Sequence, residues 1–144
     1  MLGNTMKVSK LVIGSLFAVV LAGCAQTDVQ PISKTSFMVA TTAAPACGRS
    51  GARKVANQAA AIEVIKRGGD RFLFVDQSTG SRITGMSYTG YGGWNTYNSN
   101  EQNLVVQMVS RGQKGYSDSL SAKEVLGPDW QEMVASGTPQ TCTS

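Results

Sequence analysis

The chain contains no histidine among its 144 residues. This absence excludes Ser-His-Asp and Cys-His catalytic arrangements, and with them the metal hydrolases that depend on imidazole ligands. Cysteine is scarce as well, with three residues in all. A zinc site usually needs four sulfur or nitrogen ligands, so none is expected. The sequence predicts no catalytic residue, no metal site and no cofactor.

Long apolar runs and phosphate-binding motifs are also missing. Residues 11–20 are apolar except for Gly14 and Ser15, whereas a membrane-spanning helix needs about 20 apolar residues. The glycine-rich stretch at residues 90–93 lacks the Lys-Ser/Thr pair of a phosphate loop. The apolar run instead follows a short basic segment with Lys7 and Lys10, which is typical of an export signal. Translation from Met1 or from Met6 fits this pattern equally.

The signal ends in a lipobox, Leu21-Ala22-Gly23-Cys24. In such a motif the cysteine thiol takes a diacylglycerol, and the peptidase then cuts the bond before it. The sequence thus predicts a signal peptide at residues 1–23 and lipidation at Cys24. The alternative is a buried cysteine that ends a core helix. Because Ala25 rather than Asp follows the cysteine, we expect the periplasmic face of the outer membrane.

Removing residues 1–23 leaves 121 residues, with 11 basic and 9 acidic side chains and a net charge of +2. No basic cluster of the kind found in nucleic-acid-binding proteins is present, so no nucleic-acid partner is expected. Cys47 and Cys142 then remain as a pair in an oxidising compartment, which predicts a disulfide. Two free thiols are the alternative.

Residues 24–34 are polar and contain Pro31, and we expect a lipidated cysteine followed by a flexible tether. Residues 35–144 are expected to form one small domain. The β-forming residues 35–42 predict a strand, and apolar residues at helical spacing predict a helix over residues 51–66, with Ser50 as its N-cap and Gly68-Gly69 as its stop.

A strand buried on both faces is expected at residues 70–76, which gives a βαβ pattern with the preceding helix. Another strand is expected at 104–110, with Leu104, Val106 and Met108 on one face. Ser121 and Glu124 have capping-box spacing, which predicts a helix that Gly127-Pro128 interrupts. The expected fold is α+β: a small sheet of three to four strands with a βαβ unit and a C-terminal helix.

Residues 77–103 are rich in glycine and read as an irregular surface loop, with a short strand at 83–88. Aromatic residues among glycines can stack on a sugar or a protein partner, or can cover the edge of the core. We take four of them as a candidate partner-binding loop: Tyr88, Tyr91, Trp94 and Tyr97.

The stretch from Ala56 to Val75 resembles a pattern in small, functionally uncharacterised proteobacterial lipoproteins. Its marks are the pair Ala56 and Ala60, then Gly69, Arg71 and the strand 72–75, with later likeness at residues 106–108 and 122–126. The segment 85–100 departs from the pattern. The resemblance implies an envelope location and an α+β fold, and it supplies no catalytic residue. A fold-level similarity is to a disulfide-bonded lipoprotein that senses envelope stress.

The favoured function is therefore a non-enzymatic envelope lipoprotein, anchored in membrane lipid, that binds an envelope protein or glycan. One alternative is a stress sensor whose signal is the state of Cys47 and Cys142. The other is an enzyme, in which Cys47 before a helix N-terminus supplies a thiolate. Three carboxylates, Glu63, Asp70 and Asp76, have no recognisable partner for such chemistry.

Overall fold

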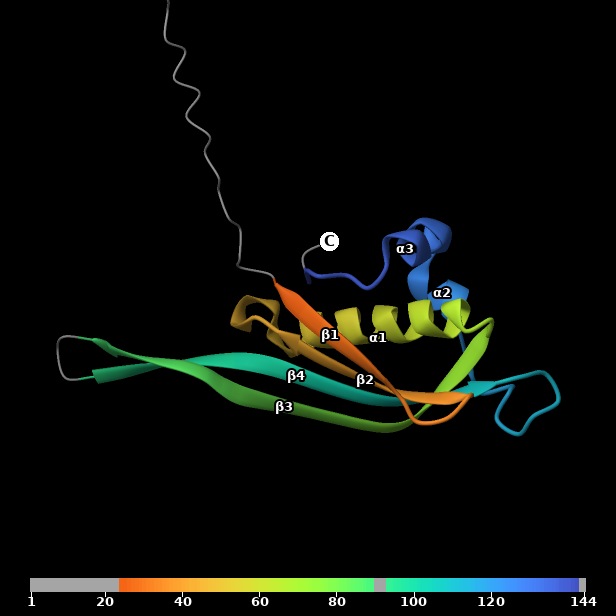
Figure 1. The fold of residues 1–144 in the computed structure, drawn as a ribbon, viewed down its shortest axis with the longest axis horizontal. Helices are drawn as coiled ribbons and strands as arrows, with labels where there is room; N and C mark the ends of the chain where they lie inside the picture. Colours follow the sequence, from red (N-terminus) through yellow and green to blue (C-terminus); the bar gives the residue numbers. More distant parts are fainter. Residues whose placement is uncertain (1–23, 90–92, 143–144) are drawn as a thin grey trace, which may run out of the picture.

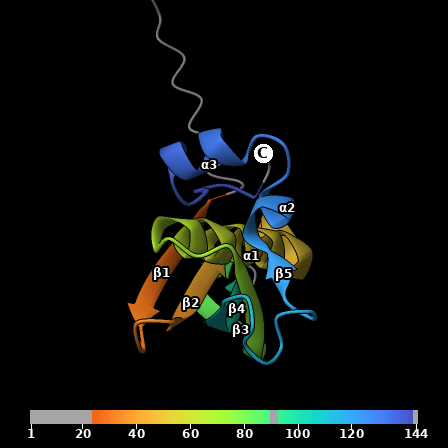
Figure 2. The same ribbon diagram turned by 90° about the vertical axis from the view of Figure 1, so that its right-hand side faces the viewer.

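The computed structural model describes residues 24–89 and 93–142, with the backbone alone for residues 79 and 81–98. An antiparallel five-stranded sheet is covered on one face by helices (Figures 1 and 2). In chain order the elements are β1 (Ala25–Pro31), β2 (Ser36–Ala43), the 3-10 turn η1 (Pro45–Cys47), α1 (Gly48–Lys66), β3 (Arg71–Thr89), β4 (Gly93–Val109), β5 (Leu120–Ser121), α2 (Ala122–Leu126) and α3 (Trp130–Ser136). The predicted α+β class is confirmed, with more strands than expected.

The strands lie in the order β1-β2-β4-β3-β5. Both β2 and β3 pair antiparallel with β4, which lies between them. β2 and β3 therefore run in the same direction, and α1 connects them. The predicted strand–helix–strand unit is present in this split form, in which a third strand separates the two parallel ones.

The core lies between the sheet and α1. Phe37 and Val39 from β2 and Leu104 and Val106 from β4 are fully buried there. The helix contributes its small residues, so that its backbone can lie close to the strands: Ala52, Ala56, Ala59, Ala60 and Ala61 are all buried. Met108 packs against the same cluster, which confirms the predicted inner face of β4.

The expectation that residues 70–76 are buried on both faces is wrong. Phe72 is fully buried, but Val75 is 59% exposed. Helices cover one face of this antiparallel sheet, so each strand alternates between core and solvent. The register also shifts between Phe74 and Asp76, which leaves Val75 at a β-bulge.

The structure also differs from the expected tether, because residues 25–31 form the edge strand β1. The pairing runs from Ala25 opposite Ala43 to Pro31 opposite Phe37. The segment alternates, with Ala25, Thr27 and Val29 less exposed than the residues between them. Pro31 is compatible with this place because it ends an edge strand. The folded unit therefore begins at Ala25 rather than at residue 35.

The residues at the helix ends determine where each helix begins and ends. α1 begins earlier than expected, with Cys47 as its N-cap in place of Ser50. It ends as predicted, where Gly68 takes a positive φ of 80° that favours glycine. The Ser121 hydroxyl accepts a hydrogen bond from the Glu124 amide at 3.5 Å, so the predicted cap of α2 is present. The predicted interruption at Gly127-Pro128 is also present, because α2 ends at Leu126 and α3 begins at Trp130.

The largest correction concerns residues 77–103, expected to be an irregular loop. β3 and β4 instead pair along almost this whole stretch, from Gln77 opposite Leu104 to Thr89 opposite Gly93. Sequence alternation is weak here because serine, threonine, asparagine and glycine fill many positions. A two-stranded ribbon can form from such residues, since its backbone pairing needs no continuous apolar face.

Candidate functional site

All three cysteines gather at one corner of the domain, where β1 begins and α1 starts. We call this the cysteine corner and define it by Cys24, Cys47 and Cys142. Beneath it lies a small apolar cluster that is separate from the main core and consists of Ala25, Ala43, Cys47, Ala52 and Val55, with Ala44 and Cys142 packed against it.

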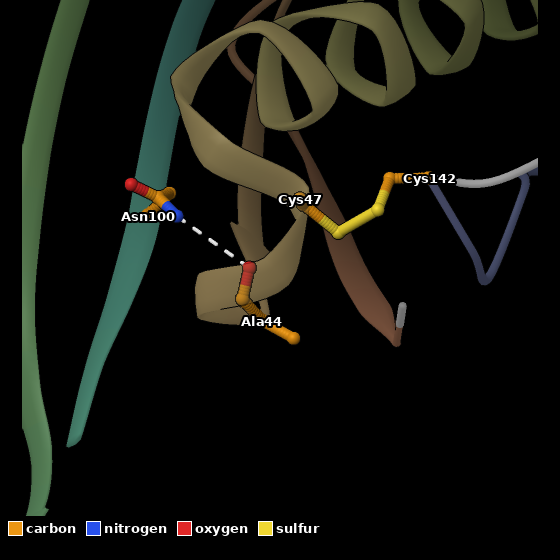
Figure 3. The surroundings of a disulfide bond; sticks show 4 residues. All are labelled: Ala44, Cys47, Asn100 and Cys142. Carbon is orange, nitrogen blue, oxygen red and sulfur yellow. Dashed lines mark hydrogen bonds between the residues drawn. A yellow bond between two sulfur atoms is a disulfide. The ribbon is translucent and has the colours of Figure 1, made fainter. Parts of the chain in front are cut away.

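The predicted disulfide joins Cys47 to Cys142, with their Cα atoms 5.7 Å apart (Figure 3). It connects the start of α1 to the C-terminal tail across 95 positions in the sequence. On the other side of η1, the Asn100 side chain donates a hydrogen bond to the Ala44 carbonyl at 3.5 Å. As a bonded cysteine, Cys47 supplies no thiolate for the enzymatic alternative.

Cys24 is exposed and its thiol is free, while its backbone is fixed on two sides. The Cys24 carbonyl accepts a hydrogen bond from the Ala44 amide at 2.9 Å, and the Ala25 amide donates to the Gln140 carbonyl at 2.8 Å. Thr141 forms an isolated β-bridge with Cys24. Sequence reasoning missed the strand that begins at Ala25, for which the alternation within residues 25–30 was the one signal.

Gly51 permits the close packing of α1 against the disulfide. A Cβ at this position would lie 3.0 Å from the Cβ of Cys47 and 3.2 Å from the Cβ of Cys142. Alanine in a helix interior normally stabilises by roughly 0.5–1 kcal/mol relative to glycine. Here both neighbouring atoms belong to a cross-linked pair that cannot easily move apart, so overpacking acts against that gain.

We expect Gly51→Ala to destabilise the oxidised protein by about 1–3 kcal/mol, the usual cost of overpacking. In a Cys142→Ser background the tail can retreat, so the same change should cost clearly less. Urea unfolding of the four proteins in this double-mutant cycle measures the coupling. Equal costs in the two backgrounds would contradict the packing account.

The candidate aromatic residues lie on a ribbon that projects from the sheet. Ala25, Ala43, Asn100 and Ser81 pair across successive strands in one row at the cysteine corner. Beyond this row β1 and β2 have ended, and β3 and β4 continue alone as residues 82–89 and 93–99, which we call the arm (Figure 1). At about 3.4 Å per residue, it extends roughly 24 Å.

Two of the candidate residues are paired with each other in the backbone register of the ribbon. Tyr88 is paired with Trp94, and Tyr97 is paired with Gly85. Tyr91, the fourth, lies outside the described residues. The three described candidates are therefore brought onto one two-stranded ribbon, which projects from the sheet in place of the expected loop.

The carboxylates considered for the enzymatic alternative are not brought together. Glu63 forms an ion pair with Arg67, at 2.7 Å between Oε1 and Nε. Asp70 precedes β3 and Asp76 lies within it, beyond the bulge. Within residues 24–89 and 93–142, no group of three or more cysteine and acidic side chains is placed so that it could hold a metal ion.

The cysteine corner also has a basic side. Arg49, Arg53 and Lys54 are exposed in the first two turns of α1, and no acidic residue stands in its first turn. A cation in the first turn of a helix costs about 0.3–1 kcal/mol, so helix stability does not account for Arg49. Arg53 and Lys54 line an open hollow together with Ser50, Asn57, Gln58 and Val125.

No known protein family, curated protein or solved structure matches this chain. Among the residues that the structure describes, no helix is long and apolar enough to cross a membrane.

Proposed function

We propose that this chain is an exported lipoprotein, held on an envelope membrane through acyl chains on Cys24. We further propose that its domain binds another envelope component and catalyses no reaction. The outer membrane is the favoured location, because Ala25 follows the anchor cysteine. The observation that carries the proposal is that the three cysteines are in two different chemical states.

Cys24 is the exposed free thiol at the start of the first strand, whereas Cys47 and Cys142 are consumed in a disulfide. Disulfides persist in oxidising compartments, which an exported domain reaches. The remaining thiol is the one that follows Leu21-Ala22-Gly23. Two or three acyl chains on it would anchor the protein stably, since each buried methylene contributes roughly 0.8 kcal/mol.

The binding role is supported by the chemistry of the chain. Without histidine the commonest general base is missing, and the three candidate carboxylates do not form one group among the described residues. The arm, in contrast, offers aromatic residues and backbone edges on a ribbon that reaches past the rest of the sheet. Such features suit recognition better than proton transfer.

The test is lipidation at Cys24. We expect Cys24→Ala to abolish incorporation of a fatty-acid analogue and to leave an unprocessed precursor, because no other side chain of the lipobox can accept the diacylglycerol. Gel fluorescence after metabolic labelling, together with intact mass, measures both. Cys142→Ser is the matched control and should keep the label. A labelled Cys24→Ala protein would refute the proposal.

A further inference from the structure

The arm and the anchor leave the domain at the same end. Cys24 directly precedes Ala25, which lies in one row with Ala43, Asn100 and Ser81. At this row β1 begins and β2 ends, and the arm continues beyond it. With strands about 4.8 Å apart, Cys24 and the base of the arm are separated by roughly 10–15 Å. Acyl chains on Cys24 would therefore hold the arm close to the lipid surface.

The arm is also a structure that needs a partner. Within the described residues, no third strand pairs with residues 82–89 or 93–99. An isolated two-stranded ribbon is marginally stable at best in water. Something that covers the arm would therefore stabilise it.

The composition of the arm points to the occupant. Its sequence has a single charged residue, Arg82, and no acidic one. Tryptophan and tyrosine prefer the boundary between lipid headgroups and acyl chains, where an apolar ring and a polar atom are both accommodated. The apolar and aromatic residues of the arm are Ile83, Met86, Tyr88, Trp94 and Tyr97.

The basic side of α1 adds positive charge, which is attracted to anionic lipid headgroups. Arg49 and Arg53 are exposed close to Cys47, and thus at the anchored end. Basic residues close to an anionic membrane are attracted to its surface. Glu101, the acidic residue in the row next to this end, is on β4 opposite Thr42. Its neighbours in the chain, Asn100 and Gln102, belong to the face covered by η1 and α1, so Glu101 belongs to the opposite face.

We propose that the arm docks on the membrane that holds the anchor, with its aromatic residues at the headgroup boundary and Arg49 and Arg53 against anionic headgroups. This inference rests on the proposed anchoring at Cys24. A second copy of the chain, pairing along the open edge of β3, is the competing occupant, and the experiment separates the two.

The chain has two tryptophans, one in the arm and one in α3, so fluorescence can read each. The full chain is expressed, purified from membranes, and reconstituted into phosphatidylcholine vesicles with or without phosphatidylglycerol. Trp130→Phe leaves Trp94 as the reporter, and Trp94→Phe leaves Trp130 as the matched control. If Trp130→Phe impairs folding by circular dichroism, subtracting the Trp94→Phe signal from the wild type isolates Trp94.

We expect brominated lipids to quench Trp94 strongly and Trp130 weakly, with a blue shift of Trp94 emission. Quenching should be greater in vesicles with phosphatidylglycerol, and Arg49→Gln with Arg53→Gln should remove that preference. Trp94 that is unquenched in both kinds of vesicle would overturn the inference. If light scattering then shows a dimer, the arm belongs to a second copy. An unchanged lipid preference in the double variant would overturn the role of the two arginines.

Intact mass separates failure of the arm from failure of the anchor. If Cys24 carries acyl chains and Trp94 is unquenched, the arm inference fails and the anchor stands. If Cys24 is unmodified, the anchor proposal fails. Coupling its thiol to a maleimide phospholipid then places the same corner on the vesicle. Quenching in that case supports the geometry of the arm, and its absence overturns it.

Discussion

Replacing Phe37 with alanine is expected to lower the free energy of unfolding by about 3–5 kcal/mol, the usual cost of truncating a buried phenylalanine. Phe37 is fully buried in β2, opposite Val106 of β4 and Pro31 of β1. The Arg67 guanidinium lies 4.7 Å from the centre of its ring, an attraction that alanine would also lose. Because α1 and three strands meet around this ring, the cavity cannot easily collapse.

Chemical denaturation followed by circular dichroism measures the effect of Phe37→Ala. Ile32→Ala is the matched control, since Ile32 directly follows β1 but is 60% exposed. Its substitution should change the free energy of unfolding by less than about 0.5 kcal/mol. Equal effects of the two substitutions would mean that Phe37 does not occupy the core as described.

Opening the disulfide is the second change with a large expected effect. Cys142→Ser should lower the free energy of unfolding by about 2–5 kcal/mol, as is typical for a small secreted domain. The bond closes a loop of 95 positions, so its loss greatly increases the freedom of the unfolded chain. In the folded state, the loss of the bond would also release the tail. The Gln140 carbonyl of this tail accepts a hydrogen bond from the Ala25 amide.

Thermal melting with and without a reductant tests the role of the disulfide. The wild type should lose stability when reduced, whereas Cys142→Ser should be insensitive to the reductant. Cys24→Ser is the control, compared in the soluble domain of residues 24–144 produced without the signal peptide, because that thiol is exposed and outside the disulfide, and it should melt like the same domain with Cys24. If reduction leaves the wild-type melting temperature unchanged, the disulfide contributes no stability.

The parts of the fold that sequence reasoning predicted well have strong local signals. Alanines at helical spacing and the glycines after Lys66 indicated α1, and alternating Leu104, Val106 and Met108 indicated the inner face of β4. The disulfide was predicted from the number of cysteines and the expected export alone. Each of these inferences depends on residues close in sequence or on a count, so no knowledge of tertiary pairing was needed.

The parts that were mispredicted depend on long-range pairing. β1 consists mostly of polar residues and ends in a proline, and it is a strand because β2 offers an open edge to it. The arm was predicted to be a loop, because its glycines and small polar residues obscure the alternation of apolar and polar residues that is typical of a strand. Its aromatic residues could be proposed as a binding surface, but their cross-strand pairing and their place beside the anchor needed the register of β3 on β4.

For a protein anchored at Cys24, the absence of a spacer after that residue would limit where it can act. A flexible segment of ten residues would allow a domain to search over roughly 15–20 Å from its attachment point. Here the sheet begins at the very next residue, Ala25. A domain lipidated at Cys24 would stay within its own height of the bilayer, so a partner fixed deeper in the periplasm would be out of reach. Its partners would have to be membrane residents, or mobile molecules that diffuse to it.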